Sequence, residues 1–169
     1  MSVSIEDIGA VANLLAAIGV LLTLIYLARQ VRQGNLFARA QARQRMAEQA
    51  HSELYEWKHD PALRACFVKK ELLTPDEQEL MHYFLLAAMR AREWEWFQYM
   101  DGVISRDVYE AYHGVIALHL GTPRTRNWWK TVGRVGFDPR FAAIVDQFIE
   151  GRPPTDYFER IRAYDAQTS

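Results

Sequence analysis

From Ile8 to Ala28 the sequence contains no charged residue, over 21 consecutive positions. A helix rises about 1.5 Å per residue, so this run would cover about 30 Å, the thickness of the hydrocarbon core of a bilayer. The absence of charge therefore predicts a transmembrane helix over residues 8–28. The alternative interpretation is an apolar helix at the centre of a soluble domain.

No Lys or Arg precedes the apolar run, because residues 1–7 read MSVSIED and their only charged side chains are acidic. Signal peptides begin with a basic region, so we expect a retained span and not a cleaved signal. The positive-inside rule then predicts that residues 1–7 lie outside and that residues 29–169 lie in the cytoplasm. Five arginines lie between the apolar run and the next acidic residue, Glu48: Arg29, Arg32, Arg39, Arg43 and Arg45.

Cysteine is nearly absent, since Cys66 is the only one in the chain. A single cysteine excludes an intrachain disulfide and a cysteine-based zinc site, and it agrees with a reducing compartment. The net charge is −1, so the chain lacks the basic excess of a nucleic-acid-binding protein, and we expect no nucleic-acid partner. The sequence also lacks a phosphate-binding loop, a nucleophile elbow and a zinc-hydrolase helix motif.

No alternating strand pattern is present, and the spacing of the apolar residues predicts helices throughout. We expect an all-α fold with one N-terminal transmembrane helix followed by a cytoplasmic helical bundle of about five to six helices. The predicted organisation is a short external N-terminus over 1–7, the span over 8–28, a helical domain over 29–151 and a C-terminal segment over 152–169. The predicted helices of the domain are 36–58, 61–70, 75–100, 105–121, 123–135 and 139–151, with a further short helix near Tyr157–Tyr164.

Two of these helices have a predicted inward face. In the helix 36–58, which follows a weak point at Gly34 and Asn35, the face contains Leu36, Ala40, Ala47, Ala50, Leu54 and Trp57. In the helix 105–121 it contains Val108, Ala111, Val115 and Leu118.

The span itself carries a stripe of small side chains. These recur three or four residues apart, at Gly9, Ala12, Ala16, Gly19 and Thr23. Small residues let helix backbones approach closely in lipid, where packing drives association. The stripe predicts that the span associates with a second copy or with the helix of a membrane partner. Alternatively, the glycines and alanines reflect only the usual composition of membrane spans.

Glu-x-x-His occurs three times, as Glu48–His51, Glu79–His82 and Glu110–His113. A Glu and a His three residues apart share one helix face, as in metal-binding helical bundles. If helices 36–58 and 75–100 are antiparallel, Glu48, His51, Glu79 and His82 lie level and form a candidate site for a divalent metal. Otherwise Glu110 and His113 form a separate cluster with Glu93, or all three pairs are exposed to solvent and bind nothing.

Two further segments carry candidate sites. In the first, Glu93 and Glu95 lie among aromatic residues. We expect one of the two to face solvent and the other to pair with Arg90 or Arg92, although a carboxylate in an apolar setting can instead act as a catalytic acid or base. In the second, helix 123–135 is either a surface helix whose tryptophans fill the core or a helix that lies on anionic lipid. The lipid-surface candidates are Arg29, Arg32, Arg126, Trp128, Lys130 and Arg134.

Residues 24–35 read LIYLARQVRQGN, followed by a stretch rich in Arg, Ala and Gln. This juncture resembles a set of uncharacterised bacterial proteins, in which an N-terminal span ends in an IYLAxQIRQN-like stretch and precedes a helical domain. The aromatic Glu93–Tyr99 segment, Asp101-Gly102 and Trp128-Trp129 are also similar, so the likeness covers most of the chain, while Gly34 departs from the usual Asn. The resemblance implies the bacterial inner membrane and no particular activity.

The sequence therefore predicts a membrane-anchored protein that assembles with itself or docks a membrane protein partner, in contact with the lipid bilayer and without inferred catalytic activity or cofactor. The alternative is a metal-binding enzyme or sensor that uses the Glu-x-x-His pairs.

Overall fold

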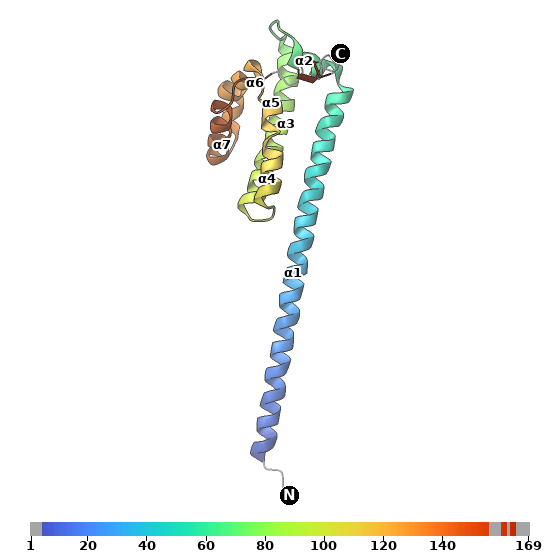
Figure 1. Ribbon diagram of the computed structural model, residues 1–169, viewed down its shortest axis with the longest axis vertical. Helices are drawn as coiled ribbons and strands as arrows, with labels where there is room; N and C mark the ends of the chain where they lie inside the picture. The colour runs from blue at the N-terminus through green and yellow to red at the C-terminus, as the bar shows by residue number, and fades with distance from the viewer. Residues whose placement is uncertain (1–4, 156–159, 162, 165–169) are drawn as a thin grey trace. The chain divides into compact units, whose positions relative to one another are not determined.

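The computed structural model describes residues 5–155, 160, 161, 163 and 164, and every regular element in this part of the chain is helical (Figure 1). No strand occurs among the described residues, which confirms the all-α prediction. Two compact units divide the chain, Met1–Gln41 and Ala42–Ser169. This division falls later than the predicted boundary after Ala28, because buried side chains begin only at Ala42.

The first unit contains the N-terminal part of helix α1, which runs from Ile5 to His59. An 18-residue window of α1 reaches a mean hydropathy of 2.3 and has none of its residues buried, so the helix is long and apolar enough to cross a membrane. The helix continues through Gly34 and Asn35, where the sequence predicts a weak point. A glycine costs about 1 kcal/mol in a helix interior but does not by itself end a helix.

The second unit begins with the remainder of α1 and continues with α2 (Pro61–Val68) and α3 (Pro75–Met100). Helices α2 and α3 both begin at the capping residues that the sequence predicts, Asp60 and Thr74. Asp60 accepts a hydrogen bond from the Leu63 amide at 2.9 Å. Thr74 and Glu77 form a capping box, in which the Glu77 amide donates to Thr74 Oγ1 and the Thr74 amide donates to Glu77 Oε2. These caps satisfy amides that have no partner within the helix.

The region predicted as one helix over 105–121 is divided at Gly114 into α4 (Arg106–His113) and α5 (Ile116–His119). Val108, Val115 and Leu118, three of the four residues predicted to point inward, are half-buried. The prediction is wrong for Ala111, which is exposed. The buried side chains of this region are Ile116, His119 and Leu120, all after the break.

The predicted helix 123–135 changes its winding midway. It is α-helical in α6 (Pro123–Trp128), widens to a π turn in η1 (Trp129–Gly133) and tightens to a 3-10 turn in η2 (Arg134–Gly136). Gly133 is required there, because a Cβ at this position would lie 2.7 Å from the Trp128 ring. The two neighbouring indoles both point inward and donate to different helices, Trp128 Nε1 to His82 at 3.0 Å and Trp129 Nε1 to Asp146 at 2.9 Å.

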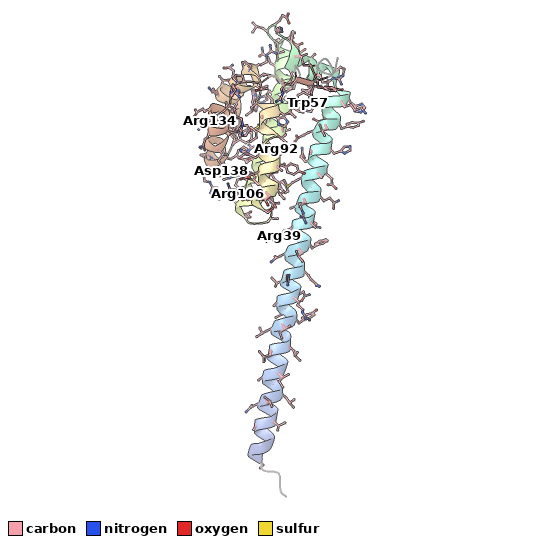
Figure 2. All side chains as sticks on the ribbon, viewed as in Figure 1. Arg39, Trp57, Arg92, Arg106, Arg134 and Asp138 are labelled. Carbon is pink, nitrogen blue, oxygen red and sulfur yellow. The ribbon has the colours of Figure 1, made fainter. Side chains whose placement is uncertain are left out.

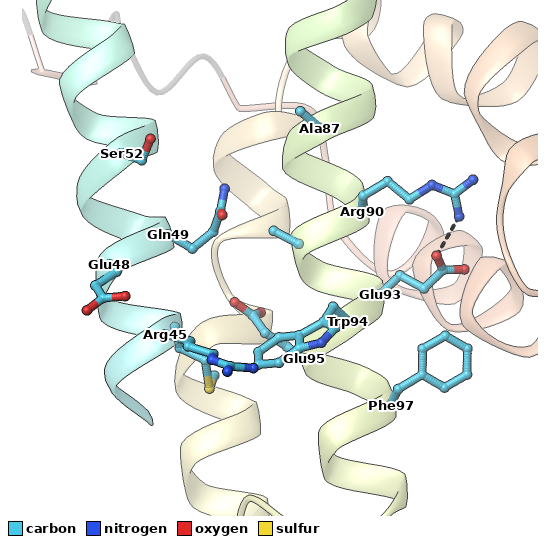
Figure 3. A pocket seen from close by; sticks show the side chains of 12 residues that line it. Arg45, Glu48, Gln49, Ser52, Ala87, Arg90, Glu93, Trp94, Glu95 and Phe97 are labelled. Atoms are coloured by element: carbon cyan, nitrogen blue, oxygen red, sulfur yellow. Dashed lines mark hydrogen bonds and ion pairs between the residues drawn. The ribbon is translucent and has the colours of Figure 1, made fainter. Parts of the chain in front are cut away.

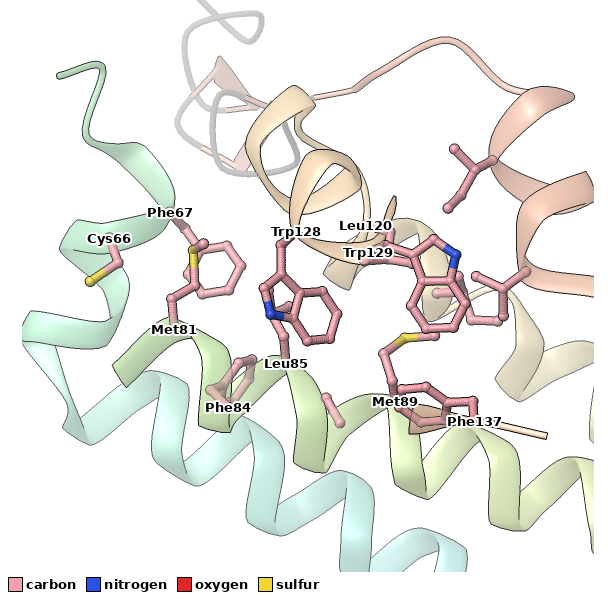
Figure 4. Close-up of a cluster of buried hydrophobic side chains, with 14 of the residues drawn as sticks. Cys66, Phe67, Met81, Phe84, Leu85, Met89, Leu120, Trp128, Trp129 and Phe137 are labelled. Atoms are coloured by element: carbon pink, nitrogen blue, oxygen red, sulfur yellow. The ribbon is translucent and has the colours of Figure 1, made fainter. Parts of the chain in front are cut away.

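Helix α7 (Pro139–Glu150) completes the second unit and begins, as predicted, after a cap at Asp138. Helix α3 contacts α2, α4, α5 and η1 and so lies at the centre of this unit. Most of the large side chains between these elements form one apolar core (Figure 4), and Ala42, Met46 and Ile104 form a second, smaller cluster. Of the short helix predicted near Tyr157–Tyr164, residues 156–159 and 162 lie outside the described residues, while 160, 161 and 163 are helical.

Candidate functional site

A cluster of ionisable side chains lies inside the second unit. Glu53 comes from α1, Arg92 and Glu95 from α3, and His119 from α5; their exposed fractions are 8%, 2%, 2% and 0%. Charged side chains are almost never fully buried unless they are paired. The cluster is therefore held by its internal contacts.

Arg92 is the centre of this cluster, and it lies within the group of helices (Figure 2). Its Nη2 atom donates to Glu53 Oε1 at 3.3 Å and lies 2.9 Å from Glu95 Oε1. Two carboxylates thus share one guanidinium nitrogen. Arg92 Nε and Nη1 are buried and have no hydrogen-bond partner among the described residues. One positive charge therefore faces two carboxylates, which leaves the cluster one negative charge in excess when both carboxylates are ionised.

Burial shifts the pKa values of the cluster. It raises the pKa of Glu95 from 4.5 to about 7, against the opposing effect of Arg92 and with a further increase from Glu53. Burial likewise raises the pKa of Glu53. Burial and the charge of Arg92 lower the pKa of His119 to about 3. His119 is therefore neutral at physiological pH, and its Nε2 atom, 3.6 Å from Glu53 Oε2, does not form an ion pair there.

A groove of about 900 Å³ lies beside the cluster, between the second-unit part of α1 and α3 (Figure 3). Glu95 belongs to both the cluster and the lining of the groove. Volumes of about 300–1,000 Å³ are typical of small-molecule sites, and perturbed carboxylates are common there. The remaining lining residues are Arg45, Met46, Glu48, Gln49, Ser52, Ala87, Arg90, Ala91, Glu93, Trp94 and Phe97.

Glu93 has a structural partner on each oxygen. Arg90 Nη1 donates to its Oε2 atom at 2.6 Å, and the Asp138 amide donates to its Oε1 atom at 2.6 Å. These bonds connect α3 to the start of α7. The prediction that one of Glu93 and Glu95 faces solvent is wrong, since both are buried. Helix α3 is central and has packed neighbours on more than one side, so both carboxylates are buried at the wall of the groove.

The predicted metal ligands are not brought together. Glu48, His51 and Glu79 are exposed, and His82 Nδ1 is occupied by the Trp128 indole. No three His, Cys, Asp or Glu side chains gather as metal ligands within residues 5–155 or the four described residues that follow.

The alternative cluster of Glu93, Glu110 and His113 is not formed either. Glu110 pairs with Arg106 at 2.6 Å, and His113 Nδ1 contacts the Tyr109 hydroxyl at 3.2 Å.

The lipid-surface candidates of the second unit have different surroundings. Trp128 is buried in the core and offers no ring to a membrane. Arg126 donates to the carbonyls of Leu120, Ile149, Arg152 and Pro153, so it holds the end of α7. Arg134 pairs with Asp146 at 2.8 Å, and Lys130 is exposed.

The predicted residues of the first unit are exposed. Arg29 and Arg32 are exposed, as is every member of the small-residue stripe. Within this stripe, the Thr23 hydroxyl donates to the Gly19 carbonyl at 2.9 Å, so its polar group is satisfied inside the helix.

Sequence reasoning missed Glu53 and His119. The buried positions of α1 in the second unit are Ala42, Met46, Glu53 and Trp57, which are spaced as one helix face. The predicted face included Leu36 and Leu54, which are exposed. The spacing of Met46, Glu53 and Trp57 was the available signal, but an acidic residue on a buried face was not expected. No family model, no curated protein and no solved structure matches this chain.

Proposed function

We propose that this chain is a single-pass protein of the bacterial inner membrane whose cytoplasmic helical bundle works by binding and assembly. The observation that carries the proposal is the contrast between the two units. The apolar window of α1 has no buried residue, whereas the second unit encloses its own core of large apolar side chains. The apolar segment of α1 is therefore not needed to complete that core, and a bilayer would remove its side chains from water.

The orientation is supported by exposed arginines after the apolar run. Arg29 and Arg32 are exposed, as are Arg39, Arg43 and Arg45. Basic residues close to the end of a span favour the cytoplasmic side. We place the N-terminus outside and the second unit inside the cell, with the basic segment near anionic headgroups.

Cysteine labelling tests this orientation. Cys66 is buried, so the wild-type chain gives a low background. We expect Ser2→Cys to react with a membrane-impermeant maleimide in intact bacterial cells, and Leu72→Cys, at an exposed position, to react only after permeabilisation. The reverse pattern would overturn the orientation. Recovery of the full chain in the soluble fraction would overturn the span.

We further propose that the small-residue stripe brings two spans together. A Cβ at Gly9 or Gly19 would meet nothing within 4 Å, so a neighbouring backbone has room to approach. We expect Gly19→Leu to weaken self-association by about tenfold, because a large side chain keeps the helices apart. Native mass spectrometry in detergent measures the oligomer fraction. Val20→Leu is the matched control, and equal oligomer fractions in both variants would exclude the stripe as the interface.

The groove beside Glu95 is the place where we propose that the helical domain receives its binding partner. It combines apolar walls with a few polar side chains, which is the usual composition of a ligand site. Nothing in the cluster supplies a nucleophile paired with a base, and His119 is held neutral and buried. The chemistry of the site therefore supports binding.

A further inference from the structure

We propose that the groove between α1 and α3 binds an organic monocation, an amine with an apolar or aromatic body, whose ammonium group pairs with Glu95. This inference rests on the proposed binding function and names the ligand class of that same groove. It is carried by the charge of the lining, the composition of the walls and the position of Glu95.

The charge of the lining favours a cation. Three glutamates and two arginines line the groove, which gives a formal charge of −1. Glu95 shares Arg92 with Glu53, so the buried cluster keeps one negative charge when both carboxylates are ionised. Arg90 is already paired with Glu93, so it does not neutralise the floor of the groove. A buried carboxylate without full compensation is costly, and a bound ammonium group would supply the missing positive charge.

The walls of the groove favour an organic ligand over a bare ion. Trp94 lies beside Glu95 in the groove, and Phe97 lies nearer to Glu93 (Figure 3). Met46, Ala87 and Ala91 add apolar surface to the lining. Aromatic faces attract cations and also cover an apolar body. A metal ion would require several ligands, and no such group of three is found in the described part of the chain.

A proton competes with the amine for the same negative charge. The groups that interact with Glu95 are Arg92 from α3, Glu53 from α1 and Tyr109 from α4. His119 from α5 lies beside Glu53, and Arg45 and Glu48 line the groove from α1. Burial raises the pKa of Tyr109 to about 12, and His119 stays neutral, so neither of them changes charge near pH 7. Because the pKa of Glu95 is about 7, its ionised fraction rises about tenfold between pH 6 and pH 8.

Three probes of similar shape and different charge test the proposal. The full chain in nanodiscs of zwitterionic lipid is titrated calorimetrically with phenethylammonium chloride, 2-phenylethanol and 3-phenylpropionate, and empty nanodiscs serve as the blank. We expect phenethylammonium to bind about tenfold more tightly than the alcohol at pH 8, and the carboxylate to bind most weakly. The affinity of phenethylammonium at pH 6 should be about tenfold lower than its affinity at pH 8.

Glu95→Gln separates this proposal from general apolar binding. The amide keeps the shape of the side chain but not its charge, so the preference for the ammonium probe and its pH dependence should both disappear. Glu110→Gln removes an exposed carboxylate outside the groove and should stay within about twofold of wild type. If Glu95→Gln does not fold, 2-phenylethanol at pH 6 and pH 8 replaces it in the wild-type chain. The affinity of this uncharged probe should not change between the two pH values, whereas that of phenethylammonium should.

Any one of three outcomes would overturn the proposal that the groove binds an amine. These are equal affinities for the three probes, an unchanged pH profile in Glu95→Gln, or no binding of phenethylammonium at millimolar concentration. None of these outcomes changes the cysteine-labelling result. The proposed ligand class and the proposed membrane topology are therefore tested independently of each other.

Discussion

Arg92→Met is expected to destabilise the helical unit by about 3–5 kcal/mol. The substitution keeps an unbranched side chain of similar length, but it leaves Glu53 and Glu95 buried without their shared cation. Removal of one member of a buried ion pair is costly, because the remaining charge has lost the favourable contact while staying out of water. Domains are stable by only about 5–15 kcal/mol, so much of this margin would be lost. Urea unfolding of the full chain in mild detergent, followed by tryptophan fluorescence, measures the change.

Arg106→Met is the matched control for this experiment. Arg106 pairs with Glu110 at 2.6 Å, but the side chains of the pair are 76% and 58% exposed. Exposed ion pairs contribute little, and we expect a change within about 0.5 kcal/mol. Combining Arg92→Met with Glu53→Leu and Glu95→Leu should restore most of the stability, since well-packed apolar residues can replace a buried ion cluster. An Arg92→Met variant as stable as the Arg106→Met variant would contradict a buried charged cluster.

The helical unit should also become less stable as the pH rises from about 5 to 8. The pKa of Glu95 is about 7 in the folded chain and near 4.5 when the chain is unfolded. The folded state therefore binds more protons in this window, and the stabilisation is fully present below about pH 4.5 and lost as the pH rises through 7. A difference of about 2.5 pKa units at 1.36 kcal/mol each gives an effect on the order of 3 kcal/mol. The raised pKa of Glu53 acts in the same direction.

Urea midpoints at several pH values between 5 and 8 measure this dependence. Glu95→Gln should be more stable than wild type at pH 8 and should show a flatter profile. Asp138 and Glu77 have lowered pKa values because of hydrogen bonds to Arg140 and Lys69, so their contributions change only at more acidic pH. A wild-type chain that gains stability from pH 5 to pH 8 would show that Glu95 is ionised throughout.

The helix starts were predictable because their signals are local. Asp60 and Thr74 cap helices through amides three residues away, and the sequence shows both the cap and the proline that follows it. The winding after Trp128 was not predictable in the same way. It depends on where two indole rings find partners, at His82 and Asp146, which are distant in the sequence.

The candidate site was only partly predictable for the same reason. The pairing of Arg92 with Glu95 follows from helical spacing, and a pairing of this kind was expected. Glu53 lies 39 positions from Arg92, and only the fold brings the two together. The Glu-x-x-His pattern does not bring three ligands together among the described residues, because Glu48 and His51 are exposed on α1 while His82 is bonded to Trp128.

The π turn over Trp129–Gly133 has a consequence for the register of the chain. A π turn contains one residue more than the equivalent α-helical turn, so it behaves as an insertion. Loss of one residue from it would restore α winding and rotate everything that follows by about 100°. Arg134 would turn away from Asp146, and the close fit of Gly133 against the Trp128 ring would be lost. The extra residue thus sets the rotation at which the segment after the π turn, including α7, packs against the rest of the second unit.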